Sequence, residues 1–175
     1  GKNRHPLDAL TCHTLARTLV RCTSLQRLSL AHNGLKDEGL QVIVDSFAAG
    51  AAPTLQELDL RHNSLQNGNL LAQLLASSSN LVTLSLEDNK LNDLAVMALS
   101  AGLSICLRMR SLSLAGNGFG DSGAVTLANT LMQQRTCPTT DATIPPPSLE
   151  ADARWLLDLA ERGSHGFFEQ RFTLF

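Results

Sequence analysis

Leu81-Val82-Thr83-Leu84-Ser85-Leu86-Glu87-Asp88-Asn89 is the stretch that decides the fold of this chain. Its pattern, Leu-x-x-Leu-x-Leu-x-x-Asn, occurs three times, and a fourth copy begins with methionine. The four copies are residues 25–33, 55–63, 81–89 and 109–117. Their asparagines recur at intervals of 30, 26 and 28 residues, the period of one structural unit repeated in tandem. The sequence therefore predicts a solenoid of stacked repeats.

Each copy predicts a short strand, a turn and a helix. The Leu-x-Leu step has the period-2 alternation of a strand, so both leucines point into the core. Apolar residues then recur at helical spacing, as in Leu40, Ile43, Val44 and Phe47, in Val96, Leu99 and Leu103, and in Leu127, Ala128 and Leu131. Asp37, Asp93 and Asp121 stand where an N-cap would accept early helical N–H groups. The second copy is shorter, and aligning its leucines assigns the deletion to the turn after Asn63.

The repeated asparagine has a predicted structural role. A strand that ends beside the next strand leaves backbone donors and acceptors inside a narrow turn, and a side-chain amide can satisfy both kinds. We expect the four asparagines to stack as a ladder.

At these residues the sequence resembles leucine-rich repeat proteins of the ribonuclease-inhibitor-like class. Residues 23–136 carry the match, which includes the further motif Leu-x-Asp-x-Gly at 35–39 and its Phe-led equivalent at 119–123. Members of this class include ribonuclease inhibitor, the Ran GTPase-activating protein, tropomodulin and the repeat regions of NOD-like receptors. The resemblance implies an α/β solenoid with a curved parallel sheet on the concave side and helices on the convex side. It also implies a scaffold for protein recognition, without naming the partner.

The chain divides into three parts. Residues 1–136 form the predicted repeat array, with a partial first repeat at 1–22 followed by four repeats. The strand of that first repeat is missing, so we expect further repeats upstream and regard the chain as a fragment of a longer protein. Residues 137–147 include three consecutive prolines and are predicted to be an extended linker. Residues 148–175 form a C-terminal amphipathic helix and a Phe-rich tail.

The C-terminal tail holds most of the aromatic residues of the chain. Four of the six phenylalanines of the whole chain lie in the last nine residues, and the only tryptophan of the chain is Trp155. The tail could fold back as a cap over the last repeat, because terminal repeats need cover. Alternatively, Trp155, Phe168 and Phe172 could insert into the groove of a partner. Both interpretations stay open at this stage.

Composition limits the classes of partner. The formal net charge is −2 with well-mixed signs, which argues against nucleic acid or an anionic lipid surface as the ligand. Four cysteines form no C-x-x-C pair, and no Asn-x-Ser/Thr acceptor occurs. These features indicate an intracellular protein, in the cytoplasm or alternatively the nucleus. No stretch approaches the roughly 18 apolar residues of a membrane span.

The candidates for chemistry are few. His32 and His62 occupy the same slot in adjacent copies and should lie about one strand spacing, roughly 5 Å, apart. They have no evident third or fourth ligand, so we predict no metal site. Glu57 with Asp59 should face solvent on one side of a strand, where nothing apolar would raise a pKa. We predict no catalytic residue and no cofactor.

The predicted binding surface is the concave sheet, with the aromatic tail as a second contact. Its candidate residues from the array are Arg27, Glu57, Asp59, Arg61, Thr83 and Glu87. The array's outward positions include no Trp, Tyr or Phe, which with Arg commonly dominate interfaces. The acids Glu57, Asp59 and Glu87 beside Arg61 could bind a basic segment of a partner, or could pair internally on a solvated surface.

The sequence thus predicts a non-enzymatic module for protein–protein interaction. One alternative is a regulatory sensor domain of a multidomain protein of the NOD-like receptor type. Another is an activator of an enzyme, as the resemblance to the Ran GTPase-activating protein permits. That second alternative requires a catalytic arginine, and neither Arg27 nor Arg61 stands on a matching motif.

Overall fold

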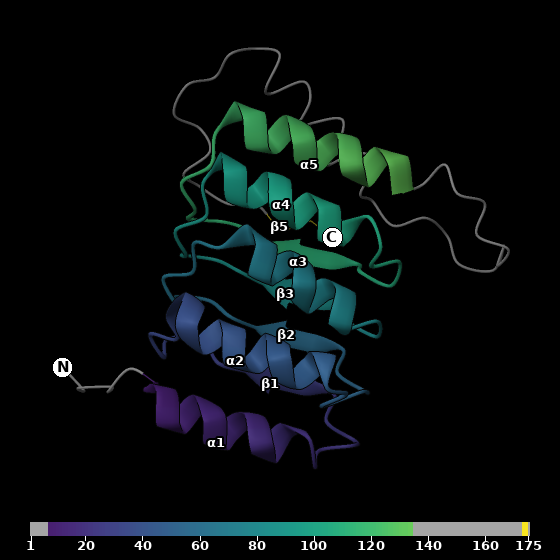
Figure 1. Ribbon diagram of the computed structural model, residues 1–175. Helices are drawn as coiled ribbons and strands as arrows, with labels where there is room; N and C mark the ends of the chain where they lie inside the picture. The colour runs from purple at the N-terminus through teal and green to yellow at the C-terminus, as the bar shows by residue number, and fades with distance from the viewer. Residues whose placement is uncertain (1–6, 135–172, 175) are drawn as a thin grey trace, which may run out of the picture.

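The computed structural model describes residues 7–134 and 173–174 as one layer of helices over one sheet (Figure 1). The helices are α1 (Ala9–Leu19), α2 (Lys36–Ala48), α3 (Gly68–Ser77), α4 (Asp93–Leu103) and α5 (Asp121–Gln134). The strands are β1 (Arg27–Ser29), β2 (Glu57–Asp59), β3 (Thr83–Ser85), β4 (Ser111–Ser113) and β5 (Thr173–Leu174). Strand and helix alternate from β1 to α5, which confirms the predicted α/β solenoid.

The first four strands pair in parallel and in the register that the repeat predicts. Leu28, Leu58, Leu84 and Leu112 align across the sheet as Cα partners. Each neighbouring strand belongs to the next repeat, so the sheet order follows the sequence order. The repeat register therefore fixes which side chains meet on the face of the sheet opposite the helices.

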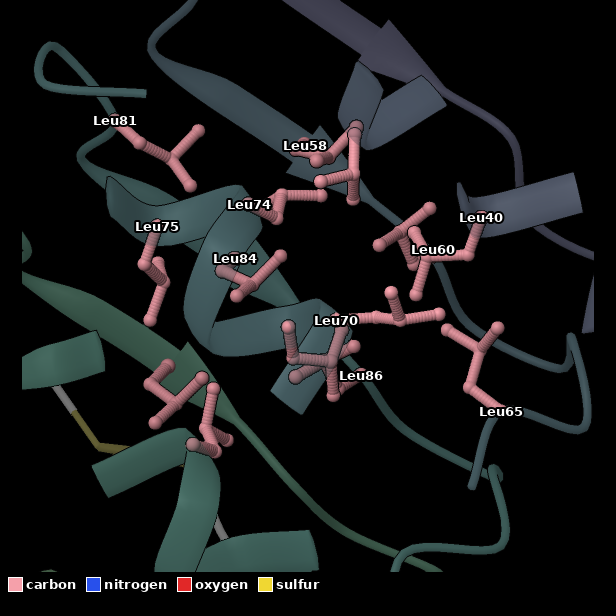
Figure 2. Close-up of a cluster of buried hydrophobic side chains, with 14 of the residues drawn as sticks. Leu40, Leu58, Leu60, Leu65, Leu70, Leu74, Leu75, Leu81, Leu84 and Leu86 are labelled. Carbon is pink, nitrogen blue, oxygen red and sulfur yellow. The ribbon is translucent and has the colours of Figure 1, made fainter. Parts of the chain in front are cut away.

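Leucines from the strands and helices interdigitate in the core. Figure 2 shows Leu58, Leu60, Leu84 and Leu86 beside Leu70 and Leu74 of α3. Most of this cluster is less than 2% exposed, which makes the centre of the array the most completely buried part. The predicted helical core positions of α2, α4 and α5 are buried as well.

The asparagine ladder is present, and each rung joins two repeats. The Asn89 side-chain amide donates to the carbonyls of Leu60 at 3.1 Å and Leu86 at 2.9 Å. Its oxygen accepts the backbone N–H groups of Asn63 and Leu65. Asn63 and Asn117 make equivalent bonds to the repeat before them. Among the described residues, no side-chain partner of Asn33 is found.

The predicted helix caps at Asp37 and Asp93 are wrong. Both residues lie in the first helical turn, and the residue before α4, Asn92, is its N-cap. The Asp93 carboxylate instead accepts N–H groups of the next repeat, from Gly120 at 2.7 Å and Gly123 at 3.0 Å. Asp37 accepts from the next repeat in the same way, through Gln66 and Asn67. These aspartates join repeats rather than end helices.

The predicted position of the deletion in the second repeat also needs correction. The segment from Asn63 to the start of α3 at Gly68 is no shorter than the one from Asn89 to Asp93. The helix α3 has lost part of its first turn instead, since it has 10 residues against 11 in α4 and starts closer to its core leucines. A Cβ on Gly68 would lie 2.0 Å from the Ala95 carbonyl oxygen, so glycine permits this close approach of α3 and α4.

A fifth strand, absent from the sequence prediction, closes the described sheet. Leu174 pairs with Leu112 and Thr173 with Ser113 in antiparallel orientation. The edge of β4 is therefore covered by the end of the chain. The linker at 137–147 and the predicted helix after it lie outside the described residues.

Candidate functional site

The candidate site is the sheet face opposite the helices, which presents three rows of side chains. One row aligns Arg27, Glu57, Thr83 and Ser111, and a second aligns Ser29, Asp59, Ser85 and Ser113. Arg61 and Glu87 belong to a third row beyond the strand ends, where neighbouring repeats stay hydrogen bonded. The repeat register therefore brings together all six array residues that the sequence analysis proposed for binding.

Arg61 is the centre of a charge network on this face. Its Nε and Nη2 each donate to the Asp59 carboxylate at 2.9 Å, which forms a bidentate pair. Its Nη1 lies 3.8 Å from Oε2 of Glu87 in the next repeat. Ser29 and Ser113 complete the network, because Ser29 donates to Asp59 at 3.2 Å and Ser113 to Glu87 at 2.6 Å. The network joins residues of all four repeats.

The Asp59 carboxylate is the most strongly held group of this network. Hydrogen bonds from the Arg61 side chain hold the pKa of Asp59 below its ordinary value of 3.8, although partial burial opposes the shift. The same pairing raises the pKa of Arg61. The Asp59 side chain is only 23% exposed. Both groups are therefore charged and fixed in position at neutral pH.

Arg27 and Glu57 form a second, more solvated pair at the N-terminal end of the sheet. Arg27 Nε lies 3.3 Å from Glu57 Oε1, and both side chains remain well exposed. Each of the three acids that could bind a basic segment, Glu57, Asp59 and Glu87, is therefore paired with an arginine of this chain. In the unliganded protein these charges form internal pairs, which was one of the two interpretations of the sequence. A ligand would therefore bind to a pre-organised surface.

The half of the face formed by β3 and β4 is uncharged within the strands. Its four outward positions are the hydroxyl residues Thr83, Ser85, Ser111 and Ser113, of which Ser113 is only 4% exposed. These side chains are short, so the face is flat here and rises toward the charged side chains of β1 and β2. The face therefore offers a charged half beside a hydroxyl-lined half.

A column of side chains lines the rim beside this face. Its members precede the ladder asparagines: His32, His62, Asp88 and Gly116. All four adopt positive φ, between 51° and 68°. His32 and His62 stack with ring centroids 4.0 Å apart, and His62 Nε2 lies 3.0 Å from Asp88 Oδ2. A Cβ at Gly116 would come within 2.2 Å of Asp88 Oδ1, so a larger residue there would displace the Asp88 carboxylate.

Three predicted contact residues lie in the C-terminal tail, whereas the structure describes residues 7–134 and 173–174. Trp155, Phe168 and Phe172 lie outside the described residues. Within residues 7–134 and 173–174, no cluster of three or more His, Cys, Asp or Glu is placed to hold a metal ion. No helix of that same part has both the length and the apolar character needed to cross a membrane.

Comparison with known proteins identifies the repeats. The family profile described as Leucine Rich repeat matches residues 21–44, 51–68, 77–100 and 108–128. The chain belongs to the leucine-rich repeat family. Mouse ribonuclease inhibitor is 32% identical over 74% of this chain and 29% of its own length. Bovine NACHT, LRR and PYD domains-containing protein 3 is 29% identical over 73% of this chain and 15% of its own length.

These relatives are much longer than the present chain, which spans less than a third of either. Among solved structures, the tropomodulin C-terminal domain of Caenorhabditis elegans has a TM-score of 0.61 at 13% sequence identity. The alignment covers 89% of this chain and 92% of that domain. This likeness extends the leucine-rich repeat assignment to the three-dimensional fold.

Proposed function

We propose that this leucine-rich repeat array is a protein-binding module without catalytic activity, and that its partner binds the sheet face opposite the helices. The observation that carries this proposal is the charge network centred on Arg61, which fixes polar side chains of four repeats on one open face. A pre-organised surface of this kind loses little side-chain entropy when a partner binds. The partner would be an intracellular protein, in the cytoplasm or the nucleus.

The charges of the face indicate the chemistry of that partner. Glu57, Asp59 and Glu87 oppose only Arg27 and Arg61, so one negative charge remains uncompensated. Glu57 is the most accessible of these acids, with about half of its side chain exposed. A partner with basic side chains would complement this half, and its polar groups would meet the hydroxyl-lined half.

The test is affinity capture from cell extract with the chain and with a variant in which Glu57 and Glu87 are both changed to lysine. The matched control reverses Glu38 and Asp45 instead, two exposed acids on α2. We expect the first variant to lose a captured protein that the wild type and the control both retain. Equal capture by all three folded proteins would contradict binding at this face.

A regulatory role in a longer protein is a second candidate, favoured by the similarity to a NACHT, LRR and PYD domains-containing protein. In that role the array would bind another domain of its own chain. The sequence of the full-length gene tests this candidate directly, because it requires an upstream nucleotide-binding domain. The enzyme-activator alternative has less support, since Arg61 is already held by Asp59.

A further inference from the structure

The convex face over α4 carries a concentration of exposed apolar side chains. The described residues include six large hydrophobic side chains that are exposed, and four of them lie between positions 94 and 107. These are Leu94 at 74%, Met97 at 44%, Ile105 at 60% and Leu107 at 79% exposure. Scattered exposed leucines need no explanation, but a group confined to one helix and its end does.

Three of these side chains form a stripe along one side of α4. Leu94, Met97, Ala101 and Ile105 follow the i, i+3, i+7, i+11 spacing of a single helical face, and all four are exposed. Ile105 lies two residues beyond α4, in a turn closed by the bond from its N–H to the Gly102 carbonyl. The opposite side of α4 is buried against the core. The helix is therefore apolar on both sides.

The helices that flank this stripe are almost uncharged. The helices α3, α4 and α5 contain only two charged residues, Asp93 and Asp121, whereas α2 alone contains four. In Figure 1, α4 lies between α3 and α5 on the helical layer. The neighbouring exposed positions are Asn69, Gln73 and Ala76 on α3 and Ser122 and Asn129 on α5. The stripe (Leu94, Met97, Ala101 and Ile105) thus has a neutral surround.

We propose that the α4 stripe binds the same stripe of a second copy of this chain, in a two-fold dimer with the two α4 helices antiparallel. A two-fold interface requires that a surface be complementary to itself. Antiparallel pairing places Leu94 opposite Ile105 and Met97 opposite Ala101, so apolar side chains face apolar side chains along the whole stripe. The neutral surround lets this surface meet itself without like-charge repulsion.

The ends of α4 differ in charge in a way that favours the antiparallel arrangement. Asp93 and Asp121 lie at the N-terminal ends of α4 and α5, together with one cation, Lys90. Arg108 and Arg110, both exposed, follow the C-terminal end of α4. Two-fold pairing brings the more acidic end of one copy toward the basic end of the other. It also sets the two helix dipoles antiparallel, with the positive end of each helix beside the negative end of the other.

The arrangement of the surface resembles that of a standard interface. A standard interface covers about 800 Å² on each partner, with an apolar centre and a polar rim. The stripe with Leu107 supplies the centre, and the neutral positions of α3 and α5 supply the rim. The sheet face stays open in such a dimer, so the proposed protein-binding function does not depend on dimerisation.

Sedimentation velocity of the whole chain tests the proposal, at concentrations up to roughly 100 µM, which would detect a Kd of that order. We expect a concentration-dependent dimer. Leu94→Glu should raise its Kd at least roughly tenfold, because it places a charge in the apolar centre. Leu10→Glu is the matched control, since Leu10 on α1 is 75% exposed and lies outside the stripe. Urea unfolding should show that both variants keep the stability of the wild type.

Each other result overturns the proposal. A chain that stays monomeric over the whole range has no such dimer. A dimer that survives in Leu94→Glu, or that Leu10→Glu weakens equally, has its interface elsewhere. If the wild type stays monomeric but binds phosphatidylcholine vesicles through Leu94, the stripe contacts a lipid surface rather than a second copy.

Discussion

At the scale of single residues, Asn89 is the clearest link between neighbouring repeats. Its amide makes five bonds to backbone groups, and the residue is 7% exposed. Asn89→Ala should therefore lower the free energy of unfolding by at least about 2 kcal/mol, because each stranded buried group costs about 1–3 kcal/mol. Urea unfolding followed by circular dichroism measures the change.

Asn33→Ala is the control within the same chain. Asn33 occupies the same position in the first repeat but is only partly buried, and within the described residues its side chain has no partner. We expect a loss well below that of Asn89→Ala. Equal losses at the two positions would mean that the hydrogen bonds of the asparagine side chains between repeats do not set the stability of the ladder.

The pair of Asp59 and Arg61 makes a prediction about pH. The pKa of Asp59 is lowered chiefly by hydrogen bonds from Arg61, so the pair stabilises the fold above the ordinary pKa of 3.8. That contribution is lost as the pH falls through the lowered pKa. Arg61→Gln should raise the pKa of Asp59 toward 3.8, which carboxyl-detected NMR titration would measure. The stability difference between wild type and variant should shrink on acidification.

Arg110→Gln serves as the control for this titration, because Arg110 precedes β4, two strands away from Asp59. The pKa of Asp59 should be the same in this variant as in the wild type. An unchanged pKa in Arg61→Gln would show that the bidentate pair does not form in solution.

At the scale of the elements, α3 and α4 approach so closely that glycine should be more stable than alanine at one helical position. Alanine is favoured over glycine in a helix by about 1 kcal/mol. At Gly102 of α4, however, an added Cβ would lie 2.6 Å from the Ala72 Cα and 2.9 Å from its carbonyl oxygen. We expect Gly102→Ala to destabilise the protein by roughly 1–3 kcal/mol, since the two backbones must separate.

Thermal and urea unfolding would measure this effect, with Ala101→Gly as the companion variant. Ala101 is exposed and adjacent, so its replacement should cost only the helix preference of about 1 kcal/mol. If Gly102→Ala instead stabilised the chain by that amount, the helices would not be packed as closely as described.

The elements also show what the sequence could and could not predict. The strand register and the ladder follow from the repeated leucines and asparagines, which recur at positions that any two copies share. The bonds of Asp93 were missed because its partners lie 27 and 30 residues later, beyond any local capping rule. Alternation placed Asp59 and Arg61 on one face, but it could not decide between internal pairing and a free acidic surface. The strand β5 has only two residues, too few to show a pattern.

At the scale of the whole molecule, stability should be highest at the centre of the array and fall toward its first strand. A solenoid is held together by contacts between neighbours, so a repeat with two described neighbours is better supported than one with a single neighbour. Leu84 in β3 is fully buried, whereas its register equivalent Leu28 in β1 is only partly buried. Leu84→Ala should therefore cost about 2–5 kcal/mol, and Leu28→Ala distinctly less.

Both variants remove the same atoms at equivalent positions, so a difference between their losses of stability reflects the difference in burial. Urea unfolding of both variants gives the two losses, and hydrogen exchange shows where each variant opens. We expect Leu84→Ala to increase exchange on both sides of β3, because β2 and β4 both depend on it, and Leu28→Ala to affect mainly the first repeat. Equal losses and equally widespread exchange would mean that the array unfolds as a single unit with no gradient along its axis.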